Sequence, residues 1–150
     1  MIYSAGCEYA IRAVMKLAAM VPPGQFMLLR DLVESEGMPA HFVGKVLQTL
    51  ARAEVLVSAK GRGGGFALAR PPAEITLRQI VEAIDGPARI GRCILGFAQC
   101  DDAQPCPQHD DWVEIRRHIY DLLDNTTVAD LLKAMARKQR SGARATARPG

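Results

Sequence analysis

The sequence has no apolar run long enough to cross a membrane. A membrane-spanning helix needs roughly 18 consecutive apolar residues, whereas the first apolar stretch of this chain is interrupted by Glu8, Arg12 and Lys16. The same charges leave no signal-peptide pattern at the N-terminus. We therefore expect a cytoplasmic protein without a membrane partner.

Residues suited to catalysis are also scarce. The histidines are His41, His109 and His118, and none can be placed beside a serine or cysteine nucleophile together with a third orienting group. The glycine-rich segment 61–65 lacks the residue order of a phosphate-binding P-loop and opens no helix. The sequence therefore predicts a protein that is not an enzyme.

The excess of charge is small. A net charge of +3 is only a weak indication of a nucleic-acid partner, so the positions of the charges carry more information than their sum. A length of 150 residues with 49% hydrophobic content suits one ordinary domain, or a small domain with an oligomerisation element.

Cysteine is rare except in one short stretch. Cys93, Cys100, Cys106 and His109 follow one another with gaps of six, five and two residues, and the only other cysteine is Cys7. A loop of this composition has no apolar face to bury, so something other than packing must order it. Thiolates select zinc, copper(I) or iron–sulfur clusters. The spacing is looser than the paired knuckles of a zinc ribbon and suits a larger object, but zinc and an iron–sulfur cluster both remain open. Structural disulfides are less typical of a reducing cytosol.

The N-terminal half predicts a helix-turn-helix. Apolar residues recur at helical spacing over residues 4–20, 29–36 and 39–53, with a glycine–proline turn at 37–39 between the last two. The third helix divides into an apolar stripe and a face that carries hydrogen-bond donors without a carboxylate. The stripe contains Phe42, Val43, Val46, Leu47 and Leu50. We expect DNA contacts from the start and outer face of this helix, at Pro39, His41, Lys45, Gln48 and Arg52.

A β-hairpin is predicted directly after these helices. Residues 54–58 and 66–69 have strand character, and the turn between them is rich in glycine and carries Lys60 and Arg62. A slim basic tip of this kind suits a wing that lies against phosphates or enters a minor groove. The fold class is therefore mostly α with a small hairpin, a winged helix-turn-helix occupying residues 1–86.

The remainder predicts a cysteine-rich loop over 87–110, then a dimerisation helix and a C-terminal helix over 111–138. A capping box, Thr76 with Gln79, opens the helix before the loop. In the longer helix after the loop, four residues follow coiled-coil spacing and predict a dimer seam, although a core-facing stripe is the alternative. They are Trp112, Ile115, Ile119 and Leu122. The basic tail, 139–150, is expected to be disordered.

These features together resemble the bacterial winged-helix regulators of the IscR, NsrR and RirA group. The resemblance covers nearly the whole chain. It is carried by Tyr9-Ala10-Ile11-Arg12-Ala13, Gly61-Arg62-Gly63-Gly64-Gly65-Phe66, Glu74-Ile75-Thr76-Leu77, Ile84-Asp85-Gly86 and Thr127-Val128-Ala129-Asp130-Leu131.

The resemblance implies a homodimeric transcriptional regulator, usually a repressor, that binds a double-stranded DNA operator. It implies that Cys93, Cys100 and Cys106 hold an iron–sulfur cluster, of the 2Fe-2S or 4Fe-4S type, which reports iron, cluster supply, nitric oxide or redox state. The fourth ligand is expected to be His109, with Glu8 or Cys7 from the partner subunit as alternatives. A loop that holds structural zinc, or that forms disulfides reversibly, is the competing interpretation.

Overall fold

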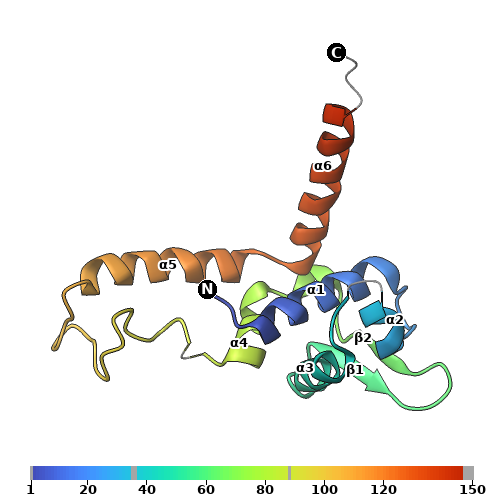
Figure 1. Cartoon of the computed structure of the whole chain (residues 1–150), viewed down its shortest axis with the longest axis horizontal. Helices are drawn as coiled ribbons and strands as arrows, with labels where there is room; N and C mark the ends of the chain where they lie inside the picture. Colours follow the sequence, from blue (N-terminus) through green and yellow to red (C-terminus); the bar gives the residue numbers. More distant parts are fainter. Residues whose placement is uncertain (1, 35–36, 88, 147–150) are drawn as a thin grey trace.

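The computed structural model describes residues 2–34, 37–87 and 89–146. This part of the chain contains six α-helices and a two-stranded antiparallel hairpin at one edge of the molecule (Figure 1), which confirms the predicted fold class. The elements in order are α1 (Ala5–Met20), α2 (Leu29–Glu34), α3 (Ala40–Arg52), β1 (Leu56–Ala59), β2 (Gly65–Leu68), the 3-10 turn η1 (Pro72–Glu74), α4 (Leu77–Asp85), α5 (His109–Asn125) and α6 (Val128–Thr146). None of the helices in the described segments is long and apolar enough to cross a bilayer.

The main core lies between α1, α3, α4 and the hairpin. Leu17, Leu47, Leu50 and Ile80 are fully buried there, and each comes from the apolar side of its helix. Phe42 corrects the predicted stripe of α3, because it is 42% exposed and its ring lies in a T-shaped arrangement with the Tyr9 ring. It lies about 100° around the helix from Val43, at the border between the two faces.

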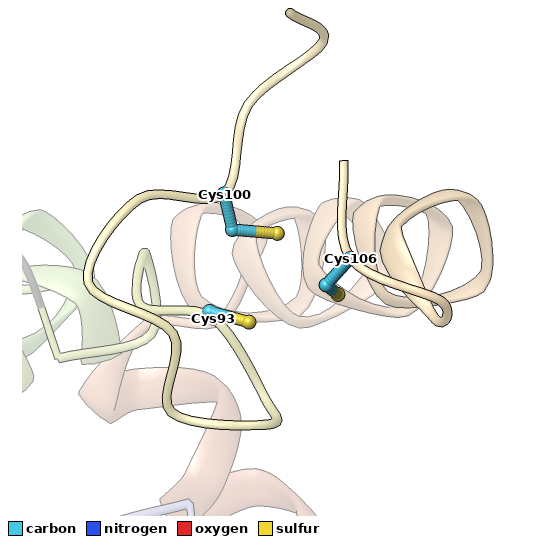
Figure 2. A group of neighbouring side chains, drawn as sticks. All are labelled: Cys93, Cys100 and Cys106. Carbon is cyan, nitrogen blue, oxygen red and sulfur yellow. The ribbon is translucent and has the colours of Figure 1, made fainter. Parts of the chain in front are cut away.

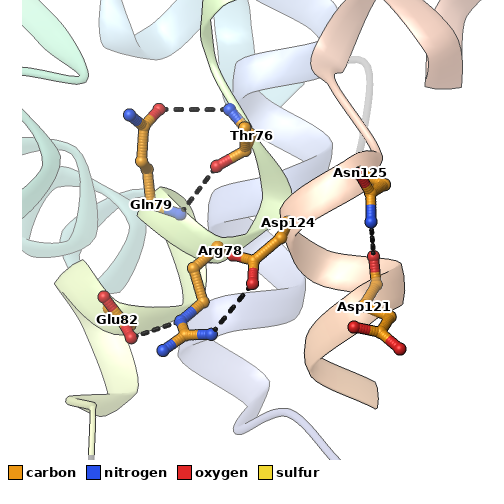
Figure 3. Close-up of polar contacts among 7 residues, drawn as sticks. All are labelled: Thr76, Arg78, Gln79, Glu82, Asp121, Asp124 and Asn125. Atoms are coloured by element: carbon orange, nitrogen blue, oxygen red, sulfur yellow. Dashed lines mark hydrogen bonds and ion pairs between the residues drawn. The ribbon is translucent and has the colours of Figure 1, made fainter. Parts of the chain in front are cut away.

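Two helix starts are fixed by side chains. The predicted capping box of α4 is present (Figure 3). The Thr76 hydroxyl accepts from the backbone N–H of Gln79 at 3.3 Å, and the side-chain oxygen Oε1 of Gln79 accepts from the backbone N–H of Thr76 at 3.1 Å. At α1, the Ser4 hydroxyl accepts from the Cys7 N–H at 3.1 Å. Both bonds satisfy backbone donors that the first turn of a helix leaves without a partner.

Asp85 joins the end of α4 to the start of α1. Its side chain is only 3% exposed, and it accepts from the Ser4 N–H at 2.9 Å and from the Ser4 hydroxyl. Arg89 completes the surroundings with an ion pair at 3.4 Å. Gly86 follows with φ 79°, a left-handed conformation that suits glycine and ends α4. The motif Ile84-Asp85-Gly86, noted in the sequence only as a resemblance, is therefore a structural joint.

Arg78 forms a second joint, between α4 and α5. Its guanidinium pairs with Glu82 on its own helix and with Asp124 on α5 at 3.4 Å (Figure 3). The same group lies 4.2 Å from the centre of the Tyr120 ring, a cation–π contact. On α5, Leu123 is fully buried in a second apolar cluster, which also contains Cys7, Leu77 and Val81. Beyond this joint, α5 and α6 project from the winged helix in two different directions (Figure 1).

The C-terminal helix is longer than the sequence indicated. We expected it to end near residue 138, but α6 continues to Thr146, so the predicted disorder is wrong for residues 139–146. Residues 139–146 lack an apolar pattern, yet they are mainly good helix formers such as alanine and arginine. They contain no proline, the next one in the chain being Pro149. Residues 147–150, and residues 35–36 of the predicted second helix, lie outside the described segments.

Candidate cluster site and nucleic-acid interface

The cysteine-rich loop brings its three thiols together. The Sγ atoms of Cys93, Cys100 and Cys106 all lie within 4.8 Å of one another, and Figure 2 shows the three side chains converging on one point beside α5. Several turns fold the loop, including one in which the Asp101 carboxylate accepts from the N–H groups of Ala103 and Gln104 at 3.0 and 2.9 Å. Coordination of a soft metal requires several thiols to lie close together in space, as these three do although they are separated in the sequence.

His109, the first residue of α5, lies against this group. Its side chain is only 7% exposed, with Nδ1 3.2 Å from the Cys100 Sγ and Nε2 3.1 Å from Asp102 Oδ1. The sequence singled out His109 but missed Asp102, because an aspartate in a polar loop gives no signal of its own. Among the described residues, the group of ligand atoms that are all close to one another contains the three sulfur atoms alone, and the imidazole lies against one of them, Cys100.

The thiols of the loop differ in acidity. The bond to His109 is the largest of the effects that lower the pKa of Cys100 to about 7, whereas burial raises the pKa of Cys106 to about 11. The same bond to Cys100, followed by the bond to Asp102, raises the pKa of His109. Because the thiolate is the form that binds metal, the Cys100 sulfur is more readily available at neutral pH than the Cys106 sulfur.

The alternative ligands on α1 have other surroundings. Cys7 is completely buried in the second apolar cluster with Leu77, Val81 and Leu123. Burial, and then the charge of Asp85, raises its pKa to about 12. Glu8, its neighbour, is half-buried. Among the described residues of one subunit, neither belongs to the group of converging ligand atoms.

The predicted recognition face lies on the open side of α3. His41, Lys45, Gln48 and Arg52 are all exposed there, and they line one shallow groove without a carboxylate. Arg52 donates to the Thr49 hydroxyl at 3.1 Å, which directs its guanidinium along the helix. Pro39, also exposed, precedes the first turn of α3. The polar side chains that line this groove therefore carry hydrogen-bond donors and no negative charge.

The wing is anchored at its base and open at its tip. Lys60 and Arg62 are exposed at the tip. At the base, the Phe66 and Met27 backbones exchange hydrogen bonds of 2.9 Å in both directions. Gly65 makes this approach possible, because a Cβ at that position would lie 2.1 Å from the Met27 carbonyl oxygen. The hairpin is therefore held against the body while its charges face outward.

The predicted dimer seam divides into two kinds of residue. Ile115 and Leu122 are 50% and 57% exposed. Ile119 packs against the second apolar cluster, and Trp112 donates from Nε1 to the Arg92 carbonyl at 2.8 Å. Part of the stripe thus packs within its own subunit, as the alternative interpretation held, and Ile115 and Leu122 remain about half exposed.

Comparison with known proteins identifies the family. Residues 3–134 match the Rrf2 family, described as iron-dependent transcriptional regulators. The chain belongs to the Rrf2 family. A protein of Aquifex aeolicus, provisionally named as an HTH-type transcriptional regulator, is 31% identical over 88% of this chain and 92% of its own length. IscR of Serratia proteamaculans is 26% identical, with 93% of this chain and 87% of that protein covered.

Solved structures agree with the winged-helix fold of this Rrf2 protein. CymR of B. subtilis, titled a global cysteine regulator, superposes with a TM-score of 0.74 at 22% identity, covering 87% of this chain and 95% of that one. IscR of T. potens gives 0.70 at 24% identity, with 91% and 89% covered. Family membership confirms both the suspected resemblance and the prediction that the chain is a DNA-binding regulator rather than an enzyme.

Proposed function

We propose that this Rrf2 protein is a cytoplasmic, homodimeric repressor that senses iron, cluster supply, nitric oxide or redox state through an iron–sulfur cluster. The observation that carries the proposal is the convergence of three Sγ atoms within 4.8 Å on a loop whose residues are mostly exposed. Sulfur and imidazole donors fit such a cluster. When bound, a cluster would supply a redox-active and chemically labile centre.

Cys93, Cys100 and Cys106 would hold the cluster, with His109 as the fourth ligand. The position of its Nδ1, 3.2 Å from the Cys100 Sγ, supports this choice. Cys7 is a weaker candidate, because a fully buried thiol whose pKa is raised to about 12 stays protonated at neutral pH. Glu8 is half-buried on α1 and would have to come from the partner subunit.

DNA binding would use the exposed face of α3 together with the wing. A two-fold dimer formed through α5 would place two such helices on successive half-sites of an operator. The loop lies in the chain between the joint at Arg78 and the start of α5, so a change in its order would alter how α5 is held. Such a change can shift two recognition helices relative to each other.

The test is the composition and colour of anaerobically purified protein. We expect a coloured protein containing iron and sulfide, and colourless protein with a Cys93→Ala, Cys100→Ala or Cys106→Ala substitution. Cys7→Ala serves as the matched control, because it also removes one thiol but leaves the loop intact. Protein without iron would contradict the proposal.

A second candidate function keeps the regulator and replaces the cluster. Three cysteines and one histidine also form a common structural zinc set, and the short distances between the thiols suit reversible disulfides. Stoichiometric zinc in colourless protein would support the first alternative. Metal-free protein whose operator affinity changes on mild oxidation would support the second.

A further inference from the structure

The imidazole of His109 is held from both sides. Nδ1 lies 3.2 Å from the Cys100 Sγ, and Nε2 lies 3.1 Å from Asp102 Oδ1. His109 is 7% exposed, whereas Asp102 is fully exposed. The two atoms of the ring that can bind a metal or a proton therefore have different neighbours, one a candidate ligand and the other a carboxylate.

The chemistry of the carboxylate decides where the proton lies. An ionised carboxylate only accepts hydrogen bonds, so its partner nitrogen must carry a hydrogen. A neutral imidazole has a single N–H, and placing it at Nε2 leaves the lone pair at Nδ1, the atom that faces the thiols. Carboxylates that hold a metal-binding histidine in this way also increase the basicity of the ring.

We propose that Asp102 is a positioning residue that holds His109 with Nε2 protonated and presents Nδ1 to the metal site. The inference rests on the proposed function, in which the loop binds metal. It assigns the ligand atom to Nδ1 and gives a role to a residue outside the set of four donors.

The chain offers a matched control for the loss of charge. Asp110 follows His109 directly and is exposed, and its carboxylate forms no hydrogen bond or ion pair with another residue in the described segments. Asp110→Ala removes the same charge from the same neighbourhood without touching the imidazole. A purely electrostatic role of Asp102 would therefore be reproduced by this variant.

Cobalt(II) is the probe, because its absorption reports the number of thiolate ligands whether or not the native metal is iron. Metal-free protein is titrated anaerobically. We expect Asp102→Ala to bind cobalt about tenfold more weakly than the wild type, or weaker still, since loss of such an outer contact commonly costs 10–100-fold. Asp110→Ala should bind like the wild type. In a His109→Ala background, adding Asp102→Ala should change nothing further, because the aspartate acts through the ring.

The outcomes separate this inference from the proposed function. Equal cobalt affinities of Asp102→Ala, Asp110→Ala and wild type would overturn the role of Asp102, even if the purified protein carries a cluster. A full Asp102→Ala effect that persists without His109 would overturn it as well. Iron-free protein that nevertheless shows the expected pattern would retain the role of Asp102 and reject the iron–sulfur cluster. A wild type without thiolate-to-cobalt absorption would reject both.

Discussion

The cysteines of this chain occupy opposite environments. Cys93, Cys100 and Cys106 converge in a polar loop, whereas Cys7 is completely buried among apolar side chains of three helices. A buried thiol of the second kind behaves as a small apolar group. Its proximity in sequence to Glu8 made Cys7 a candidate ligand, whereas its burial within its own subunit favours a packing role.

A Cys7→Ser substitution separates these two roles. The hydroxyl would be buried beside Leu77, Val81 and Leu123 with a poorer environment than the thiol, so we expect a loss of about 1–3 kcal/mol in the free energy of unfolding. Metal content should not change. Urea unfolding and metal analysis of the same preparation check both points, and a stable variant that has lost its metal would identify Cys7 as a ligand.

Single residues also mark the limits of prediction from sequence. His109 was recognisable because a histidine separated from a cysteine by only two residues suggests a ligand. Asp102 was not, since its role depends on a loop conformation that brings it to 3.1 Å from the ring. Asp85 matched a family pattern. Its hydrogen bond with Ser4, which is 81 residues away in the chain, depends on the tertiary structure and could not be predicted from local sequence.

At the scale of elements, the wing is the simplest part to test. Arg62 lies at an exposed tip anchored through Met27 and Phe66. Replacing Arg62 with alanine should weaken operator binding by about 1–3 kcal/mol if the side chain enters a groove. Fluorescence anisotropy with operator DNA at several salt concentrations measures this. Arg137→Ala makes an equal change of charge on α6 and should not weaken operator binding. If Arg62→Ala binds the operator as tightly as the wild type, the wing is not part of the DNA interface.

The joint at Arg78 is a second prediction at this scale. Arg78→Ala removes the contacts with Asp124 and Tyr120, so α5 should be held less firmly on the winged helix. We expect the variant still to bind metal and still to bind DNA. The effect of metal on operator affinity should become smaller, so that the ratio of the affinities measured with and without metal moves towards one. Arg117→Ala is the control, because the contacts that its side chain makes among the described residues, with Asp121 and His118, lie on its own helix. An unchanged ratio in Arg78→Ala would exclude the joint from coupling.

Elements were predictable where local chemistry agrees with packing. The buried stripe of α3 and the capping box of α4 follow from spacing and from two side chains, and both are present. The end of α6 was missed because the prediction depended on an apolar pattern. Residues 139–146 have none, and their helix rests on intrinsic propensity.

For the whole molecule, the central question is assembly. Ile115 and Leu122 lie on one side of α5 and are about half exposed, which favours the proposed seam. An Ile115→Asp substitution should place a carboxylate in a dimer contact and shift the protein to monomers in sedimentation velocity. It should leave the fold of the subunit unchanged, because Ile115 is absent from both apolar clusters.

Arg117→Asp is the matched control for assembly. It lies about 200° around the helix from Ile115 and is exposed, so it introduces the same side chain on the opposite side of α5. This variant should remain dimeric. If Ile115→Asp sediments as a dimer as well, the contact between subunits lies on another surface.

The loop stands at the outer end of α5, away from α3 and the wing (Figure 1), and most of its residues are exposed. If the protein is the proposed repressor, a diffusing oxidant or nitric oxide molecule would reach the loop while the protein is still bound to its operator. Such a regulator could detect an oxidant or nitric oxide without first dissociating from its promoter. The delay before transcription starts would be set by the departure of the altered protein from DNA, so it should shorten as ionic strength rises.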